Sequence, residues 1–316
     1  MSQIRGRFAP SPTGEMHLGN AWTALLAWLH TRNQGGQMVL RIEDLDPDRS
    51  RQDYVKQLLA DMHWLGLDWD EGPDMGGQYG PYCQSQRCAF YEDALNKLQT
   101  ADLVYPCYCT RSELHAVTLA PHLGENEFIY PGTCRKLSIK QQAEKQKQSR
   151  RAAVRLTVPN EKIGFCDGLQ GEYQQTVGCS CGDFVIRRSD GVYAYQLAVV
   201  VDDGHMAINQ VLRGDDLLMS TPRQLLLYRL LGLPAPAFTH VPLLYGIDGS
   251  RLSKRHGSLS LASLRSRGIS AEVITGYLAW KAGQIDRWEP LQARELISQF
   301  SLKAIPVKPV IVEEVF

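Results

Sequence analysis

Residues 4–44 constrain the fold more than any other part of the chain, because they contain a strand, a buried helix and a second strand in that order. Residues 4–8 alternate apolar and polar side chains, and the Pro- and Gly-containing segment 9–14 ends that strand in a turn. Residues 18–30 are apolar on nearly all sides, which predicts a helix buried against a sheet. With a second strand over 38–42, this is a βαβ unit, and it predicts an α/β fold with a parallel sheet.

The remaining elements follow from the same periodicity rules. Helical spacing predicts helices over 53–65, 90–98 and 221–231. Apolar runs predict strands over 193–201, 211–214 and 241–245.

A change of character at Tyr105 predicts a smaller module inserted into the α/β domain. Cys, Tyr and Pro cluster there, a Lys- and Gln-rich stretch over 140–151 predicts a solvated helix, and short β-like pieces occupy 154–186. We therefore expect one α/β domain in two halves, over 1–104 and 191–257, with the inserted module between them over 105–190. A mostly helical C-terminal region is expected over 258–316.

Charge and cysteine content limit the class of protein. Lys+Arg and Asp+Glu both number 34, so the net charge is zero and a nucleic-acid partner would have to be held by a local patch. The N-terminus has no apolar signal region, and no segment approaches the length of a membrane span, which predicts a cytoplasmic protein. Without a signal peptide, the eight cysteines favour thiols or a metal site over disulfides.

The segment 7–20 joins the first strand to the N-terminus of the first helix, where unsatisfied backbone N–H groups make an anion site. Gly14 and Gly19 let a nucleotide approach the backbone closely. His17 can donate a hydrogen bond to phosphate oxygens. The alternative for this segment alone is an ordinary turn with a buried histidine.

A second motif, residues 247–257, is bounded by glycine, rich in small residues and carries three cations in five positions, Arg251, Lys254 and Arg255. Such a loop can bring a lysine to a phosphoryl group as the transition state forms. The alternative is an exposed basic loop without a catalytic role.

Together the two motifs resemble those of class I aminoacyl-tRNA synthetases. Residues 10–14 followed by His17-Leu18-Gly19-Asn20 resemble the "HIGH" signature, and residues 251–255 resemble the "KMSKS" loop. The flanking segments 7–14 and 41–44 are similar to those of the glutamyl-tRNA synthetase group, and the resemblance extends over residues 3–260. It implies a Rossmann-type catalytic domain. Asn20 replaces the family's second histidine and Leu252 replaces a methionine.

A glutamate substrate requires cations for its two carboxylates and an anion for its ammonium group. Arg7 ends the first strand and Glu43 follows the second, so both are expected at the carboxyl edge of the sheet, where ligands bind. The resemblance implies a glutamate pocket made of Arg7, Ala9, Ser11, Glu43, Tyr195 and Arg213. The alternatives are an ion pair of Arg213 with Asp215 or Asp216 and a plain core role for Tyr195.

The resemblance also implies a site for ATP, with Mg²⁺ on its phosphates. Its expected residues are Pro12, Thr13, Gly14, His17, Gly19, Asn20, Arg251, Ser253 and Lys254. In the implied reaction the α-carboxylate of L-glutamate attacks the α-phosphorus of ATP and forms glutamyl-adenylate and pyrophosphate. Because that carboxylate is already ionised at neutral pH, no general base is needed, and His17 and Lys254 are expected to stabilise the pentavalent phosphorus.

Cys107, Cys109 and Cys134 with Tyr130 offer three thiolates and one oxygen, a set that can complete a tetrahedral structural Zn²⁺ site. The arrangement resembles the zinc site of glutamyl-tRNA synthetases and their shortened relatives. The alternative is three reduced structural cysteines.

The other five cysteines carry weaker signals. Cys166, Cys179 and Cys181 could hold a second metal, but a fortuitous group of thiols is favoured. Cys83 and Cys88 are expected to be plain thiols.

Length bears on the acceptor, because only 61 residues follow Arg255. That suffices for a small helical region that contacts a tRNA stem, and we expect no anticodon-binding domain. In this respect the chain resembles the glutamyl-Q tRNA(Asp) synthetases, which activate glutamate without tRNA and attach it to the queuosine base of tRNA(Asp). The resemblance implies L-glutamate, ATP and tRNA(Asp) as partners of a monomer that does not bind membranes. The alternatives are a truncated glutamyl-tRNA synthetase that charges the tRNA 3′ end and a non-catalytic synthetase-like binding module.

Overall fold

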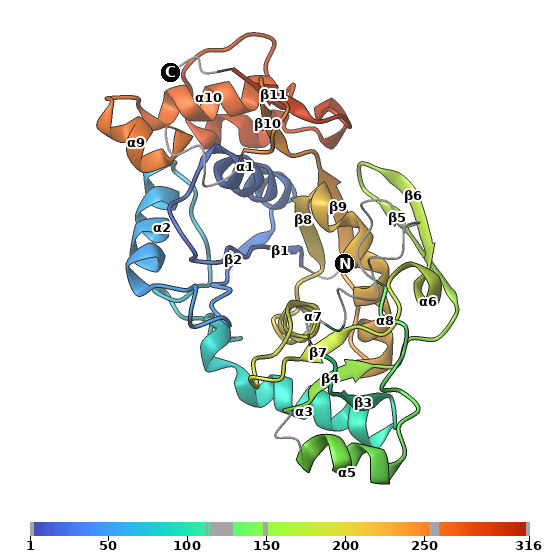
Figure 1. Ribbon diagram of the computed structural model, residues 1–316. Coiled ribbons are helices and arrows are strands. Elements are labelled where there is room, and N and C mark those ends of the chain that lie inside the picture. Colours follow the sequence, from blue (N-terminus) through green and yellow to red (C-terminus); the bar gives the residue numbers. More distant parts are fainter. Residues whose placement is uncertain (1–2, 111–112, 114–128, 148–150, 253–258, 314–316) are drawn as a thin grey trace.

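The computed structural model describes residues 3–110, 113, 129–147, 151–252 and 259–313. At its centre lies a parallel sheet of four strands in the order β2-β1-β8-β9, in agreement with the predicted α/β fold (Figure 1). The strands are β1 (Arg5–Phe8), β2 (Gln37–Leu40), β8 (Gln210–Gly214) and β9 (Ala237–Val241).

The predicted βαβ unit is confirmed. Helix α1 (Leu18–Asn33) connects β1 to β2, which pair in parallel with Arg5 opposite Gln37. Strand β8 pairs with the other side of β1. The chain therefore continues from β1 to β2 on one side of β1, whereas β8 lies on the other side. In a parallel sheet such a switch point leaves a crevice at the carboxyl ends of the strands.

Alternating side chains of the strands face two apolar cores. Met38, Leu40 and Leu212 join α1 in one core, whereas Val39 and Val211 face the other. The second core contains helices on the opposite face of the sheet, α3 (Cys88–Thr100), α7 (Tyr195–His205) and α8 (Thr221–Leu231). This two-sided burial is typical of parallel sheets, whose strands are apolar on both faces. Helix α2 (Gln52–Trp64) packs on the α1 side.

The prediction of a strand over 193–201 is wrong, because this segment starts at an extended turn and then forms α7. Residues 197–203 are buried all round the helix, so no polar stripe marks the helical period. Continuous apolar runs rich in valine do not distinguish a buried helix from a buried strand. Tyr195 is therefore the first residue of a helix rather than part of a strand. The strand predicted over 241–245 is displaced, since β9 ends at Val241 and β10 (Leu244–Gly246) follows.

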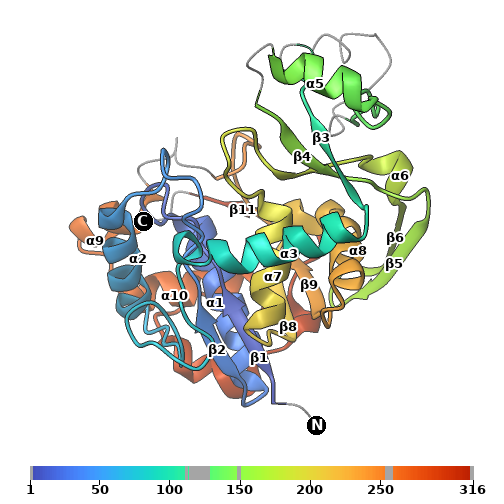
Figure 2. The same cartoon turned by 90° about the horizontal axis from the view of Figure 1, so that it is seen from below.

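The segment 105–190 contributes two small antiparallel sheets, β3-β4-β7 and the hairpin β5-β6. Figure 2 shows the first sheet and α5 projecting to one end, with β5-β6 beside α8. The solvated helix predicted there is α5, which has no buried residue. The elements are β3 (Val104–Cys107), α5 (Ile139–Lys147), β4 (Ala153–Leu156), β5 (Lys162–Asp167), β6 (Gly171–Thr176), α6 (Val177–Ser180) and β7 (Val185–Arg187).

The C-terminal residues pack on the α1 side of the sheet, at the end of the molecule opposite α5 (Figure 1). They form α9 (Leu261–Ser266), α10 (Ala271–Lys281), the 3₁₀ helices η4 (Ala293–Gln299) and η5 (Leu302–Ala304), and strand β11 (Val310–Val312). Besides the expected helices, β11 pairs in parallel with β10. Two further 3₁₀ helices are η1 (Gln84–Gln86) and η2 (Asp215–Ser220). Within the described ranges, no helix is long and apolar enough to cross a membrane.

Candidate active site

A cavity of about 450 Å³ lies at the carboxyl edge of the sheet, between the β1–α1 loop and the end of β8. Most of the predicted pocket residues line it, namely Arg7, Ala9, Ser11, Thr13, Gly14, His17, Gly19, Asn20, Glu43, Tyr195, Arg213 and Arg251. Pro12 is buried in the same loop behind the lining residues. Ser253 and Lys254 lie outside the described residues.

The first turn of α1 lies at the cavity and is closed by a capping box. His17 is its N-cap, with Nδ1 accepting a hydrogen bond from the backbone N–H of Gly19 at 3.1 Å, and Asn20 Oδ1 accepts from the backbone N–H of His17 at 3.2 Å. A neutral ring that accepts at Nδ1 carries its proton on Nε2 and can donate it. A Cβ on Gly19 would lie 3.0 Å from this ring, so a larger residue there would press on His17. The first turn has no acidic residue, so the positive end of the helix dipole is not neutralised there.

Arg213 is a buried cation whose guanidinium is only partly satisfied by the protein. Nε donates to His240 Nε2 at 3.0 Å, and Nη2 donates to Thr221 Oγ1 at 2.9 Å and Gln224 Oε1 at 2.8 Å. Nη1 is buried without a hydrogen-bond partner among the described residues. The alternative ion pair is not formed, since Asp216 pairs with Arg251 instead. A buried donor without a partner is costly, and Arg213 lines the cavity, where a carboxylate would pair with its charge.

Arg7 and Glu43 bring opposite charges to the neighbouring strand ends. Arg7 Nε contacts Asp203 Oδ2 at 3.4 Å, and Glu43 Oε1 contacts Arg41 Nη2 at 3.2 Å. Burial raises the pKa of Glu43, although Arg41 and Arg7 oppose the shift. The cavity therefore presents the cations Arg7 and Arg213 near the carboxylate of Glu43, and Glu15 and Asp216 also line it.

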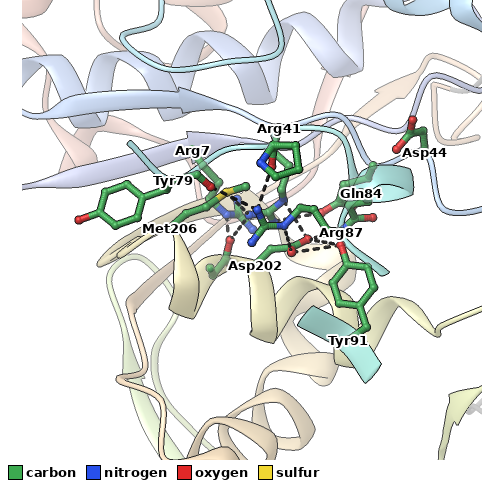
Figure 3. A network of polar contacts seen from close by, with 12 residues as sticks. Arg7, Arg41, Asp44, Tyr79, Gln84, Arg87, Tyr91, Asp202 and Met206 are labelled. Carbon is green, nitrogen blue, oxygen red and sulfur yellow. Dashed lines mark hydrogen bonds and ion pairs between the residues drawn. The ribbon is translucent and has the colours of Figure 1, made fainter. Parts of the chain in front are cut away.

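A network of buried charges supports this wall of the cavity (Figure 3). Arg41 Nη1 contacts Asp203 Oδ1 at 2.6 Å, and Arg41 Nε lies 3.7 Å from Asp202 Oδ2. Asp202 also accepts from Arg87 Nε at 2.6 Å and from the Tyr91 hydroxyl. Burial alone would raise the pKa of Asp203, but the adjacent arginines outweigh it and hold that pKa low. Neither aspartate was predicted from the sequence, where the only signal is a pair of acids after an apolar run.

Tyr195 contacts both the core and the cavity. It packs against the apolar cluster of α3, α7 and α8 and lines the cavity from the N-terminus of α7. Burial raises the pKa of its hydroxyl, so it is a neutral group. Its two proposed roles are thus compatible.

The predicted metal ligands come together in a cluster apart from the residues lining the cavity. The sulfur atoms of Cys107, Cys109 and Cys134 all lie within 4.8 Å of one another. The Tyr130 hydroxyl oxygen is 3.4 Å from the Cys107 sulfur and 3.5 Å from that of Cys109. Three sulfurs and one oxygen in this arrangement fit a tetrahedral zinc site. Burial raises the pKa of Cys109 to about 12, and a bound cation would supply the charge that stabilises its thiolate.

The remaining cysteines do not make a comparable group. Cys166 and Cys179 are exposed and Cys181 is buried. Over the part of the chain that the structure describes, the three ligands above are the only group of three or more His, Cys, Asp or Glu with this spacing. Burial raises the pKa of Cys83 to about 11, as for an unreactive thiol.

Comparisons with known proteins agree with the cavity's chemistry. The family described as "tRNA synthetases class I (E and Q), catalytic domain" matches residues 3–312. A protein of Symbiobacterium thermophilum named glutamyl-Q tRNA(Asp) synthetase is 53% identical over 306 residues, which cover 96% of this chain and 94% of that protein. Another of the same name, from Nitratidesulfovibrio vulgaris, is 54% identical over 309 residues, with 98% and 95% covered.

Longer relatives match over a smaller share of their length. Glutamate--tRNA ligase 2 of Alkalilimnicola ehrlichii is 46% identical over 279 residues, which cover 88% of this chain and 58% of that protein. The crystal structure of a glutamate tRNA ligase from Elizabethkingia meningosepticum in complex with its amino acid superposes with a TM-score of 0.85 at 27% identity, covering 98% of this chain and 67% of that one.

Proposed function

The chain belongs to the family of class I tRNA synthetases for glutamate and glutamine, and we propose that it activates L-glutamate with ATP and transfers it to the queuosine base of tRNA(Asp). The relatives named glutamyl-Q tRNA(Asp) synthetase support this acceptor, because they match at 53–54% identity over 94–95% of their own length. The glutamate--tRNA ligase from Alkalilimnicola is less similar and is matched over 58% of its length.

The observation that carries the proposal is Arg213, a buried cation that lines the cavity and whose Nη1 has no hydrogen-bond partner among the described residues. A buried guanidinium that has used its other donors on the protein is suited to one more acceptor, a substrate carboxylate. Arg7 supplies a second cation, and Glu43 supplies an anion for the ammonium group. Glutamate matches this set of charges, whereas glutamine would leave one cation without an ionic partner.

In the proposed first step, ATP binds at the N-terminus of α1 with its phosphates near Gly19 and His17. The α-carboxylate of glutamate attacks the α-phosphorus, and pyrophosphate leaves with Mg²⁺ on its oxygens. The Nε2–H of His17 and the ammonium of Lys254 stabilise the charge that develops on the phosphorus oxygens. Positioning by rigid strand ends supplies the rest of the catalysis. Lys254→Ala should therefore slow activation and leave glutamate affinity nearly intact.

We also propose that Cys107, Cys109, Tyr130 and Cys134 hold one structural Zn²⁺. The ion would pin the end of β3 to the segment 130–134, where the module has only a small apolar cluster of its own. In this scheme residues 105–190 and 258–316 contact the tRNA outside the catalytic halves, and the protein acts as a monomer.

Transfer of labelled glutamate to tRNA(Asp) with and without queuosine tests the function. We expect label on the anticodon of the queuosine-containing tRNA only, and glutamate-dependent ATP–pyrophosphate exchange without any tRNA. Label at the 3′ end would instead indicate an ordinary glutamyl-tRNA synthetase. Exchange that requires tRNA would also indicate an ordinary synthetase, and absence of exchange both with and without tRNA would indicate a binding module.

A further inference from the structure

Behind Arg213 lies a chain of buried polar side chains that the proposed reaction does not use. His240 on β9 contacts Arg213 Nε through its Nε2 at 3.0 Å. On the other side of the ring, His240 Nδ1 lies 2.6 Å from Asp167 Oδ2 at the end of β5. The His240 and Asp167 side chains are both 0% exposed, so water does not compete for these contacts.

The chemistry of the two neighbours fixes the state of the ring. An arginine Nε–H can only donate, so His240 Nε2 must accept and carries no proton. The ionised Asp167 can only accept, so the proton lies on Nδ1. Burial lowers the pKa of His240, Asp167 opposes that shift, and the Arg213 and Arg7 cations add to it, in agreement with a neutral ring.

The tip of the β5-β6 hairpin is docked tightly against β9, which holds Asp167 in place. Asp167 Oδ1 accepts from the backbone N–H groups of Leu169 at 3.0 Å, Gln170 at 2.9 Å and His240 at 3.1 Å. A Cβ on Gly168 would lie 2.3 Å from Thr239 Oγ1, so the hairpin can approach this closely only with glycine. Asp167 thus belongs to the inserted segment, and its position is set by the strand that carries His240.

We propose that Asp167 and His240 are positioning residues that orient the Arg213 guanidinium toward the substrate carboxylate and thereby set the preference for glutamate over glutamine. This inference rests on the proposed function. With Nε held by His240 and Nη2 held by Thr221 and Gln224, the plane of the guanidinium is fixed where Arg213 lines the cavity, and Nη1 has no partner among the described residues. Neither Asp167 nor His240 lines the cavity, so both act through Arg213.

Asp167→Asn tests the chain with almost no change in volume. The three backbone N–H groups retain the amide oxygen, so the amide nitrogen faces His240 Nδ1 and donates to it. The ring proton then moves to Nε2, which lies 3.0 Å from Arg213 Nε and 3.2 Å from Thr221 Oγ1. Nε2 can then donate only to Thr221, and it opposes the Arg213 Nε–H as a second donor. Loss of such a charge-assisted contact should raise the KM for L-glutamate about 10-fold or more in ATP–pyrophosphate exchange, with kcat changed less. The ratio of kcat/KM for glutamate over glutamine should fall.

A matched pair at His240 separates positioning from a structural role. The amide of His240→Gln reaches the place of Nε2 and can accept from Arg213, whereas that of His240→Asn reaches the place of Nδ1 and can satisfy only Asp167. Positioning predicts that Gln retains glutamate affinity better than Asn, as measured by calorimetry with L-glutamate. If His240 serves only as a hydrogen-bond partner of buried Asp167, His240→Asn should instead retain glutamate affinity better than His240→Gln.

The outcomes are distinct. Wild-type exchange with an unchanged glutamate KM in Asp167→Asn, or tighter glutamate binding by His240→Asn than by His240→Gln, overturns this inference and leaves the proposed function intact. If Asp167→Asn does not fold, the order of the His240 pair decides. A wild-type protein without glutamate-dependent exchange overturns the proposed function, and this inference with it.

Discussion

The cavity and the cysteine cluster both contain buried polar groups, but these groups are stabilised in different ways. The cavity wall joins residues far apart in the chain, such as Arg7 with Asp203 and Arg41 with Asp203. The cysteine cluster joins two short segments, at Cys107 and Cys109 and at Tyr130 and Cys134.

The difference lies in where the balancing charge comes from. In the cavity wall, aspartates and arginines neutralise each other, so the protein supplies its own counter-charges. In the cluster, three thiols and a phenol face one another, and the cation Arg155 lies 3.8 Å over the Tyr130 ring. A bound metal ion would supply the further positive charge that several thiolates need. Changes in one region should therefore leave the other's function intact.

The largest effect is expected from Arg213→Leu, which removes the cation that faces the substrate. We expect kcat/KM for glutamate in pyrophosphate exchange to fall about 10³-fold, equivalent to roughly 4 kcal/mol, because a buried charge partner is lost. Zinc content, measured by elemental analysis, should not change. Arg229→Gln is the control, since Arg229 lies on α8 and pairs with Glu161 at the surface. Equal losses in the two variants would contradict the assignment of Arg213.

Cys109→Ser tests the other region. Loss of one thiolate ligand should abolish zinc binding and lower the free energy of unfolding by about 3 kcal/mol, or the melting temperature by roughly 5–10 °C. Glutamate-dependent exchange should change little, because Cys109 does not line the cavity. Exposed Cys179 provides the matched control, and Cys179→Ser should retain both zinc and stability. A zinc-free wild type as stable as the zinc-loaded protein would argue against a structural ion.

The same contrast explains what the sequence could predict. The cysteine cluster was found from local spacing, and Arg7 and Glu43 from their place at strand ends, because both signals lie within short segments. The prediction over 193–201 failed because α7 is buried on all sides, and Asp202 and Asp203 were consequently not recognised as the counter-charges of Arg7 and Arg41.

His240 illustrates the limit of such reasoning. It lies in the middle of an apolar strand, and its partners Asp167 and Arg213 come from other elements. Only the packing of the β5-β6 hairpin on β9 brings them together, and no pattern in the sequence encodes that contact.

Asp203→Asn tests how much the buried charge network behind the cavity contributes to the free energy of unfolding. Arg41 retains Asp202 and Glu43 as partners, so we expect the free energy of unfolding in urea to fall by about 2 kcal/mol rather than by the full cost of an isolated buried charge. The glutamate KM should rise several-fold, since Arg7 loses the carboxylate that holds it. Asp190→Asn, which alters an exposed pair with Arg188, should change stability by less than about 0.5 kcal/mol. Similar stabilities for both variants would mean that the buried network contributes little.

Asp61 on α2 is a buried acid with fewer charged partners than Asp202 and Asp203 have, and its pKa differs accordingly. Its Oδ1 contacts Arg265 Nη2 at 2.7 Å, but its Oδ2 is buried without a hydrogen-bond partner among the described residues. Burial therefore raises the pKa of Asp61 from 3.8 to about 6, although Arg265 opposes the shift.

This raised pKa predicts the smallest of the four effects, a pH dependence of stability. Between about pH 4 and pH 6 the folded state retains a proton that the unfolded state has released, so the free energy of unfolding falls as the pH rises through this window. The fall should be on the order of 1–2 kcal/mol in the wild type and absent in Asp61→Asn, measured as the difference between their urea midpoints at each pH. Because zinc ligands and the other acids titrate equally in both proteins, the difference isolates Asp61. Parallel curves of stability against pH for the wild type and Asp61→Asn would show that one arginine is enough to keep a buried carboxylate charged. The several charged partners of Asp202 and Asp203 would then need another explanation.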